Sequence, residues 1–206
     1  MKPIVAVDGG TYFHRKTLYE APYAGFFDDI IYAPDLAQAD LSNLGCLFVT
    51  SRQSGELMAN AKENIARYLA QGGFVVAMGE TEYAKWLPNI DWHPTEVNFW
   101  WWLDKDADSG LVVNNEQHSL FNYLSLADAT WHQHGYFNPP KGADSLISIK
   151  SKGSVLYEDR VSTPGRIIVT TLDPCYHHGS YFMPSTTKFL AGFLPWLRAE
   201  LSQQGN

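Results

Sequence analysis

Residues 69–83, LAQGGFVVAMGETEY, constrain the fold more than any other stretch of the chain. A helical pattern ends at Gly72-Gly73, and residues 74–78 form a short apolar run that is typical of a buried strand. The chain then turns at Gly79 and presents polar residues, beginning with Glu80. Because ligands of open α/β sheets lie outside the carboxyl ends of the strands, this turn is the first place to expect a functional site.

Similar apolar runs recur along the chain and predict an α/β fold. The alternation of strands with a helix indicates a parallel sheet with right-handed crossovers. One helix is expected over residues 56–70, and another from about residue 184, kinked or interrupted at Pro195. Strands are expected at residues 4–7, 29–32, 46–50, 74–78, 130–137, 145–149, 154–157 and 166–171.

Composition limits the classes of partner. The formal charge of −7 and only 15 scattered basic residues argue against nucleic acid as the main partner. No apolar run approaches a membrane span, and the first residues lack a signal-peptide pattern, so a cytoplasmic protein without membrane contact is expected. Its 206 residues fit a single α/β domain, 1–206, with an aromatic-rich insertion around 84–117.

Polar side chains follow several of the predicted strands. They are expected to converge, because the carboxyl ends of parallel strands meet at one edge of the sheet. For Asp8, which follows the first strand, a role in the turn fits equally well. The residues concerned are Asp8, Gly9 and His14 after the first strand, Arg52 after the third, Glu80 and Thr81 after the fourth, and Asp173, His177 and His178 after the strand at 166–171.

The histidines form the most informative set. His132 and His134 would share one face of a strand, because their spacing is i, i+2. His132 is expected to pack with Trp131, and His178 to hydrogen-bond a loop. Site membership is favoured for Glu80, His134 and His177, because three different segments would then converge.

Two chemistries fit these residue types. Imidazoles and carboxylates suit zinc, manganese or iron, but histidines this close in sequence are a weak metal signal, so no metal ligand is assigned and the cofactor stays open. Without a metal, Glu80 and His177 could act as a general acid/base pair if the pocket tunes their pKa values toward neutrality.

Several segments resemble class I glutamine amidotransferase-like domains, especially the ThuA-like, or trehalose-utilisation-like, branch. The resemblance covers most of the chain outside residues 84–117 and implies a flavodoxin-like three-layer sandwich with a mainly parallel sheet. The segments are IVAVDGG, LGCLFVTSRQS, ENIARYLAQGGFVVAMGE, EQHSLFNYLSLADATWHQHG and RIIVTTLDPCYHHGSYFMPSTTKFLAGFLPWL.

The resemblance also implies where the chemistry differs. Amidotransferases carry a cysteine nucleophile at the turn after the fourth strand and an activating histidine in the last loop. In this chain Glu80 stands roughly where that cysteine would be, and the histidine loop is kept as His177-His178. Cys46 lies at the start of a strand and Cys175 lies in the histidine loop, so glutamine hydrolysis through a thioester is not expected.

The first functional hypothesis is an amidotransferase-like domain without the cysteine that binds a small polar ligand, such as a carbohydrate, and could carry out hydrolytic or acid/base chemistry. Glu80, His134 and His177 would be catalytic. The ligand-binding residues would be Asp8, Gly9, His14, Arg52, Thr81, Asp173 and His178.

Two alternatives stay open. A non-catalytic scaffold could use the aromatic segment at residues 99–102 as a contact surface, and self-association is compatible with it. The same segment could instead pack as a wall on the sheet or serve as a platform for a sugar or a base. A His-rich, metal-dependent hydrolase is the weaker alternative.

Overall fold

The structure, a computed structural model, describes residues 2–96, 103, 106–180 and 183–203. Its sheet has a parallel part and an antiparallel part. The parallel part runs in the order β2 (Asp29–Tyr32), β1 (Ile4–Asp8), β3 (Cys46–Val49), β4 (Phe74–Met78) and β10 (Arg166–Thr170). The antiparallel part adds β9 (Ser154–Asp159), β7 (Gly135–Phe137) and β5 (Trp92–Pro94), with β8 (Asp144–Ile149) and β6 (Leu111–Val113) beside β9.

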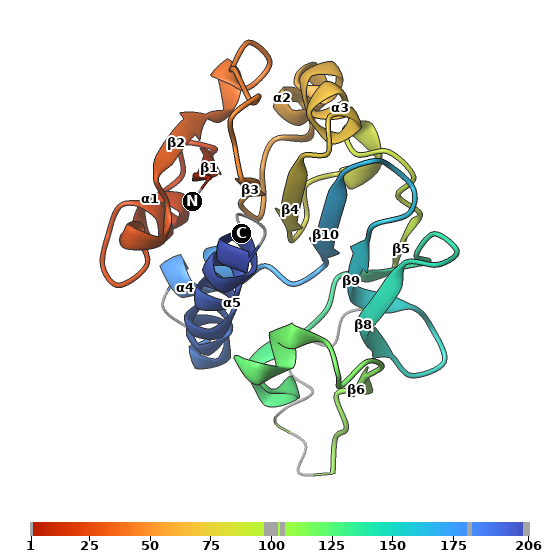
Figure 1. Cartoon of the computed structure of the whole chain (residues 1–206). Helices are drawn as coiled ribbons and strands as arrows, with labels where there is room; N and C mark the ends of the chain where they lie inside the picture. The colour runs from red at the N-terminus through yellow and green to blue at the C-terminus, as the bar shows by residue number, and fades with distance from the viewer. Residues whose placement is uncertain (1, 97–102, 104–105, 181–182, 204–206) are drawn as a thin grey trace.

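Helices cover both faces of the parallel strands (Figure 1). One core contains residues of α2 (Gly55–Asn60) and α3 (Lys62–Ala70), and the other contains residues of α1 (Tyr12–Leu18), α4 (Pro174–Ser180) and α5 (Pro184–Gln203). Strand β4 serves both cores, because Phe74, Val76 and Met78 face one of them while Val75 and Ala77 face the other. The expected three-layer sandwich is therefore confirmed.

Two predicted elements differ from the structure. The helix expected over 56–70 is divided at Ala61, which ends α2 and begins α3. The strand expected over 130–137 is wrong in its first half, since only Gly135–Phe137 pairs as β7. The preceding residues leave the sheet, and this departure lets the Trp131 indole reach the carboxyl edge.

Short elements account for most of the remaining differences. Helices α1 and α4 lie where loops were expected after β1 and β10, and β5 and β6 lie within the expected insertion. Seven-residue helices and three-residue strands are too short to show a periodic pattern. Pro195 lies inside α5, which continues past it to Gln203 instead of ending there.

Candidate functional site

Gly79 lets three loops meet at the carboxyl edge of the parallel strands. Its φ is +51°, in the left-handed region that favours glycine. A Cβ at this position would lie 2.5 Å from Cβ of Asp173 and 2.7 Å from Cβ of Ser51. The loops after β3, β4 and β10 can therefore approach one another only because residue 79 has no side chain.

Arg52 joins the two carboxylates of the site. Its Nη2 lies 3.1 Å from Oδ2 of Asp173 and 3.2 Å from Oε2 of Glu80, and its Nε donates to the same Asp173 oxygen at 3.3 Å. The guanidinium carbon also lies 3.8 Å from the ring centroid of Tyr176. The guanidinium thus holds carboxylates from two neighbouring strands in fixed relative positions.

Each carboxylate is paired with an imidazole. His134 Nδ1 lies 3.0 Å from Oε1 of Glu80, and His177 Nε2 lies 3.1 Å from Oδ1 of Asp173. Trp131 donates its indole N–H to the same Oδ1 at 3.2 Å. The result is two carboxylate–imidazole pairs joined by one guanidinium, an arrangement suited to orienting histidines for proton transfer.

The charges of the site follow from these contacts. Burial alone would raise the pKa of Asp173, but the hydrogen bond from His177 and the nearby positive groups lower it to about 2. The hydrogen bond with His134 lowers the pKa of Glu80, with burial opposing it. Burial lowers the pKa of His132 to about 4. Both carboxylates are therefore ionised at neutral pH, and His132 is neutral.

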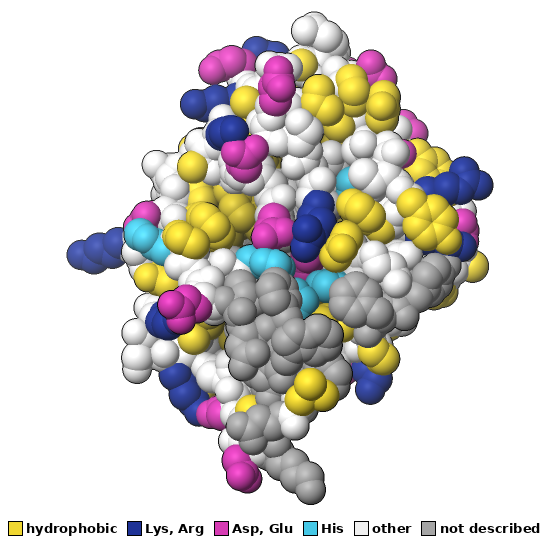
Figure 2. Space-filling model, turned by 180° about the vertical axis from the view of Figure 1, so that it is seen from behind, with side chains coloured by type: hydrophobic (Ala, Val, Ile, Leu, Met, Phe, Trp, Pro, Cys, Tyr) yellow, Lys and Arg dark blue, Asp and Glu magenta, His cyan; other side chains and the backbone are white. Residues whose placement is uncertain are grey.

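A cleft of about 640 Å³ opens beside Glu80. Its lining includes Glu82, Asp91 and the half-exposed Trp92. The indole of Trp92 lies over Gly135, where a Cβ would come within 2.6 Å of its Nε1. On the face drawn in Figure 2, histidine, acidic and basic side chains gather near the middle, next to hydrophobic ones.

Five of the predicted site residues come together at this edge. They are Glu80, His134 and His177, predicted as catalytic, and Arg52 and Asp173, predicted as ligand-binding. Four segments converge there: the loops after β3 and β4, the residues before β7, and the segment after β10. Their roles in binding and catalysis stay predictions.

Asp8, Gly9 and His14 form a separate group at the end of β1. The His14 ring is buried, with Nδ1 accepting from the Gly9 N–H at 2.9 Å and Nε2 lying 2.8 Å from the Ser51 carbonyl oxygen. Burial lowers the pKa of His14, which favours the neutral ring that these two contacts require. His14 therefore anchors the loop that carries Arg52.

Thr81 and His178 lie apart from the five residues. Thr81 is fully buried, and its carbonyl accepts the indole N–H of Trp86 at 2.9 Å. The His178 ring packs against Tyr23, and its Nδ1 lies 2.9 Å from Oγ1 of Thr187 on α5. The hydrogen bond expected for His178 thus goes to a helix.

Three residues of this edge were not predicted as part of the site. The ring of His132 lies 5.0 Å from that of His134 and 4.9 Å from that of His177, between centroids. The i, i+2 spacing of His132 and His134 was a signal for this proximity. For Trp131 as a donor to Asp173, and for Tyr176 beneath Arg52, the sequence contains no comparable signal.

Neither cysteine replaces the missing nucleophile. Cys46 and Cys175 are both fully buried and are not disulfide-bonded. Burial raises the pKa of Cys175 to about 12 and raises that of Cys46 as well. Thiolate chemistry at this edge is therefore disfavoured.

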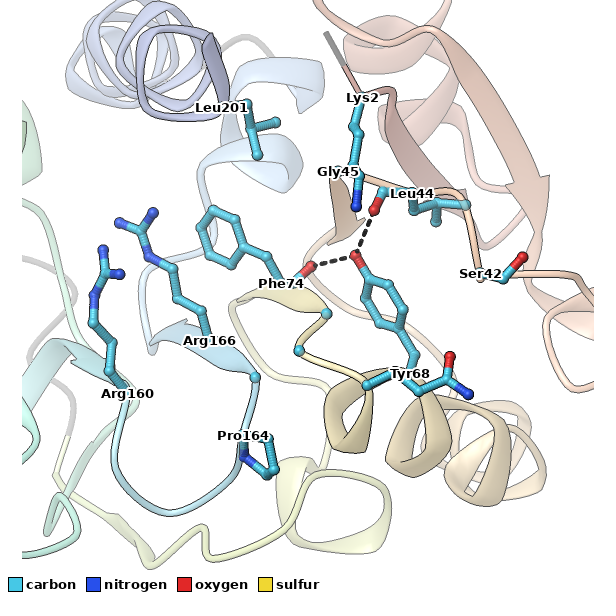
Figure 3. Close-up of a pocket in the computed structure, with 14 residues that line it drawn as sticks. Lys2, Ser42, Leu44, Gly45, Tyr68, Phe74, Arg160, Pro164, Arg166 and Leu201 are labelled. Atoms are coloured by element: carbon cyan, nitrogen blue, oxygen red, sulfur yellow. Dashed lines mark hydrogen bonds between the residues drawn. The ribbon is translucent and has the colours of Figure 1, made fainter. Parts of the chain in front are cut away.

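A second cavity, of about 530 Å³, lies at the opposite, amino edge of the strands (Figure 3). Arg160 and Arg166 line one side and Lys2 lines another. The Tyr68 hydroxyl donates to the carbonyls of Phe74 at 3.3 Å and Leu44 at 3.4 Å. No histidine lines this cavity within the described part of the chain.

The aromatic segment at 99–102, on which the scaffold hypothesis rests, lies outside the described residues. The neighbouring Trp92–Pro94 forms β5 on the edge of the sheet, where it pairs with β7. Within the ranges that the structure describes, no helix is both long and apolar enough to cross a membrane.

Comparisons with known proteins identify the fold. No protein-family model matches the chain, and no curated protein matches it. A crystal structure described as that of a ThuA-like protein from Bacteroides uniformis superposes with a TM-score of 0.53 at 12% identity, covering 94% of this chain and 89% of that one. A glutamine amidotransferase from Thermotoga maritima superposes with a TM-score of 0.52 at 8% identity, covering 98% and 84%.

These likenesses agree with the resemblance found in the sequence. The chain has the class I glutamine amidotransferase-like fold, as both neighbours do. At identities of 12% and 8% the likeness extends to the fold and not to the activity.

Proposed function

We propose that this protein is an amidotransferase-like domain without the cysteine nucleophile that binds a small polar ligand, with carbohydrates as the first class to test, and acts on it by hydrolytic or acid/base chemistry. The observation that carries the proposal is the pairing of Glu80 with His134 at the edge of the cleft. Glu80, His134 and His177 are the proposed catalytic residues. Their partner Arg52 and the buried Asp173 would hold them in place.

The Glu80–His134 pair supports proton transfer. Glu80 lies 3.0 Å from Nδ1 of His134, and its low pKa keeps it ionised, so it favours a proton on Nδ1; Nε2 of the same ring lies 3.9 Å from Oδ2 of Asp173. An imidazole oriented in this way can take a proton from a hydroxyl or from water and return it to a leaving group. Because the Glu80 side chain is 35% exposed and lines the cleft, a ligand there can reach its carboxylate.

The cleft favours a neutral polyhydroxy ligand. Carboxylates of Glu80, Glu82 and Asp91 can accept hydrogen bonds from hydroxyl groups. The exposed ring of Trp92 offers an apolar surface of the kind on which a sugar ring can pack. An anionic ligand is disfavoured, because the described residues that line the cleft include three carboxylates and one cation, Lys85, which is paired with Glu82.

A thermal-shift screen of neutral mono- and disaccharides, with carboxamides in parallel, tests the proposal. We expect a sugar to raise the melting temperature of the wild type, and Glu80→Gln and His134→Gln to abolish the associated turnover. Glu63→Gln on the exposed face of α3 is the matched control for loss of a carboxylate. Binding and turnover that survive both site substitutions would contradict the assignment.

A further inference from the structure

We propose that His132, Asp173 and His177 bind a divalent first-row transition ion such as Zn²⁺ or Fe²⁺. Two imidazoles and one carboxylate form a ligand set that these ions use, with further positions left for water. All three residues are buried, and they come from two segments that are far apart in the sequence. The inference replaces the catalytic role proposed above for His177 and leaves that of the Glu80–His134 pair unchanged. It can be tested apart from catalysis, because ion binding is measured directly.

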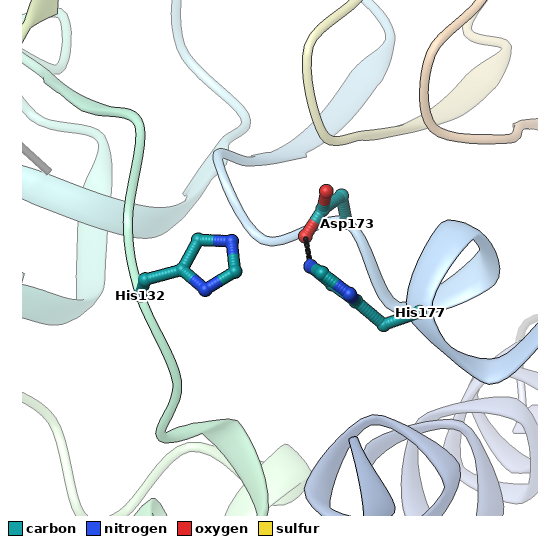
Figure 4. Close-up of side chains that lie close together, drawn as sticks. All are labelled: His132, Asp173 and His177. Atoms are coloured by element: carbon teal, nitrogen blue, oxygen red, sulfur yellow. Dashed lines mark ion pairs between the residues drawn. The ribbon is translucent and has the colours of Figure 1, made fainter. Parts of the chain in front are cut away.

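The distances suit one shared ion. One ligand atom from each residue lies within 4.8 Å of the other two, and His177 Nε2 lies 3.1 Å from Asp173 Oδ1. Ligand atoms about 2.0–2.1 Å from a tetrahedral zinc ion are separated by about 3.3 Å, so only small side-chain movements are needed. Figure 4 shows the His132 ring facing Asp173 and His177 from a different part of the chain.

The surroundings of Asp173 suit a metal ligand. Oδ1 has two lone pairs, and the Trp131 indole N–H takes one of them while the other faces Nε2 of His177. Arg52 binds the second oxygen, Oδ2, and so fixes the orientation of the carboxylate. Outer partners of this kind commonly orient the ligands of metal sites.

We assign the ion to His132, Asp173 and His177 and not to the neighbouring group of potential ligands. Glu80, His134 and Asp173 also offer ligand atoms within 4.8 Å of one another. The Nη2 of Arg52 lies 3.2 Å from Glu80 and 3.1 Å from Asp173, so a cation between those two carboxylates would meet the guanidinium. Oδ1 of Asp173 faces the indole N–H of Trp131 and the imidazole of His177, whereas Arg52 binds the other oxygen, Oδ2.

This assignment gives His177 a distinct role. A bound ion would take the Nε2 atom that now faces Asp173, so His177 would be a ligand and not a general base. The Glu80–His134 pair, whose contact does not involve that nitrogen, would keep its proposed function in proton transfer. The two roles of His177 can therefore be separated experimentally.

Titration of the full chain with Co²⁺ and Zn²⁺ tests the inference. The protein is purified without a polyhistidine tag, treated with a chelator and monitored by visible absorption and calorimetry. We expect one ion per chain, a four- or five-coordinate Co²⁺ spectrum and a rise in melting temperature. Wild-type protein that takes up no stoichiometric ion would overturn the proposal without reference to any variant.

Matched histidine variants locate the site. His132→Gln and His177→Gln should each weaken binding at least tenfold, because each removes one of three protein ligands. His178→Gln, next to His177 on α4 but bonded to Thr187, should bind like the wild type. If His132→Gln still bound the ion and His134→Gln did not, the ion would belong to the group of Glu80, His134 and Asp173, which would contradict the assignment.

A sugar-induced thermal shift, repeated with and without chelator, separates the two proposals. If wild-type protein binds no stoichiometric ion but still responds to sugar, the metal site is overturned and the proposed function stands. Circular dichroism of each variant distinguishes loss of a ligand from loss of the fold.

Discussion

Both edges of the parallel sheet gather charged side chains, but arginines predominate as carboxylate partners at the amino edge and histidines at the carboxyl edge. At the amino edge, Glu158 is buried and accepts from Arg166 Nε, from Arg160 at 3.0 Å and from His118 at 3.2 Å. Arg166 also lies 3.1 Å from Glu200 and packs its guanidinium over Phe74 at 4.3 Å. At the carboxyl edge, the single guanidinium of Arg52 serves two carboxylates, and imidazoles complete the pairing.

The difference separates a structural network from a reactive one. Arginine keeps its charge at every relevant pH, so a buried carboxylate that is paired with arginines stays ionised near neutral pH. Histidine changes its charge near neutrality and can exchange protons or bind a metal. The amino edge is therefore expected to contribute stability, whereas the carboxyl edge is expected to contribute binding and chemistry.

Removing the central arginine of the amino edge should have the largest effect. Arg166→Met leaves the buried Glu158 with weaker compensation, and we expect unfolding free energy to fall by about 3–5 kcal/mol. Urea denaturation measures the change. Arg67→Met on the exposed face of α3 is the control and should stay within about 0.5 kcal/mol of the wild type. A loss below about 1 kcal/mol for Arg166→Met would contradict the inference that the amino edge is a stabilising network.

The turn that joins the loops of the carboxyl edge should be nearly as sensitive. Gly79→Ala places a Cβ 2.8 Å from Cα of Asp173 at a φ of +51°. The left-handed backbone and the close contact together should cost about 2–5 kcal/mol. Gly72→Ala is the control: its φ is also positive, but its Cβ would meet no atom within 4 Å. Thermal unfolding of both variants isolates the contact, and equal losses would show that only the backbone matters.

Acid should weaken the amino edge through Glu158. Burial alone would raise the pKa of Glu158, but His118 and the two arginines lower it to about 2. A carboxyl group with a pKa lowered by folding stabilises the protein above its unfolded pKa of about 4.3, and this contribution disappears as pH falls toward about 2. The contribution should be roughly 3 kcal/mol.

Urea midpoints measured between about pH 5 and pH 2 should therefore fall less steeply for Glu158→Gln than for the wild type. Glu63→Gln, in an exposed position, should follow the wild-type curve. Parallel curves for Glu158→Gln and the wild type would contradict the assignment of acid sensitivity to this residue.

The smallest effect on stability is expected at Glu80. Glu80→Gln removes one partly exposed ion pair, while Arg52 keeps its contact with Asp173. We expect a change below about 1 kcal/mol in urea denaturation. The same variant should lose ligand turnover if the proposed function is right. A loss as large as that of Arg166→Met would mean that both edges are structural.

Much of the parallel sheet could be predicted from the sequence. The apolar run at 74–78 coincides with β4, because a strand buried on both faces must be apolar throughout. The run at 29–32 coincides with β2, a strand at the edge of the sheet that is only partly buried. The ends of the runs at 46–50, 74–78 and 166–171 also located Arg52, Glu80 and Asp173, because strand direction brings such residues to one edge. The α/β fold class and these three members of the site therefore follow from local patterns.

Local sequence patterns do not show which side chains meet at the site, and the tertiary structure decided this. His132 looked like a packing residue, but the chain leaves the sheet before β7 and brings its ring to within 4.9 Å of that of His177. His14 follows the end of a strand, as Glu80 does. Its ring contacts the Ser51 carbonyl and anchors the loop after β3, so it is not one of the five predicted residues that come together. The apolar pattern determines which residues are buried and where strands end, whereas the side chains that meet depend on the path of segments distant in sequence, which only the folded chain specifies.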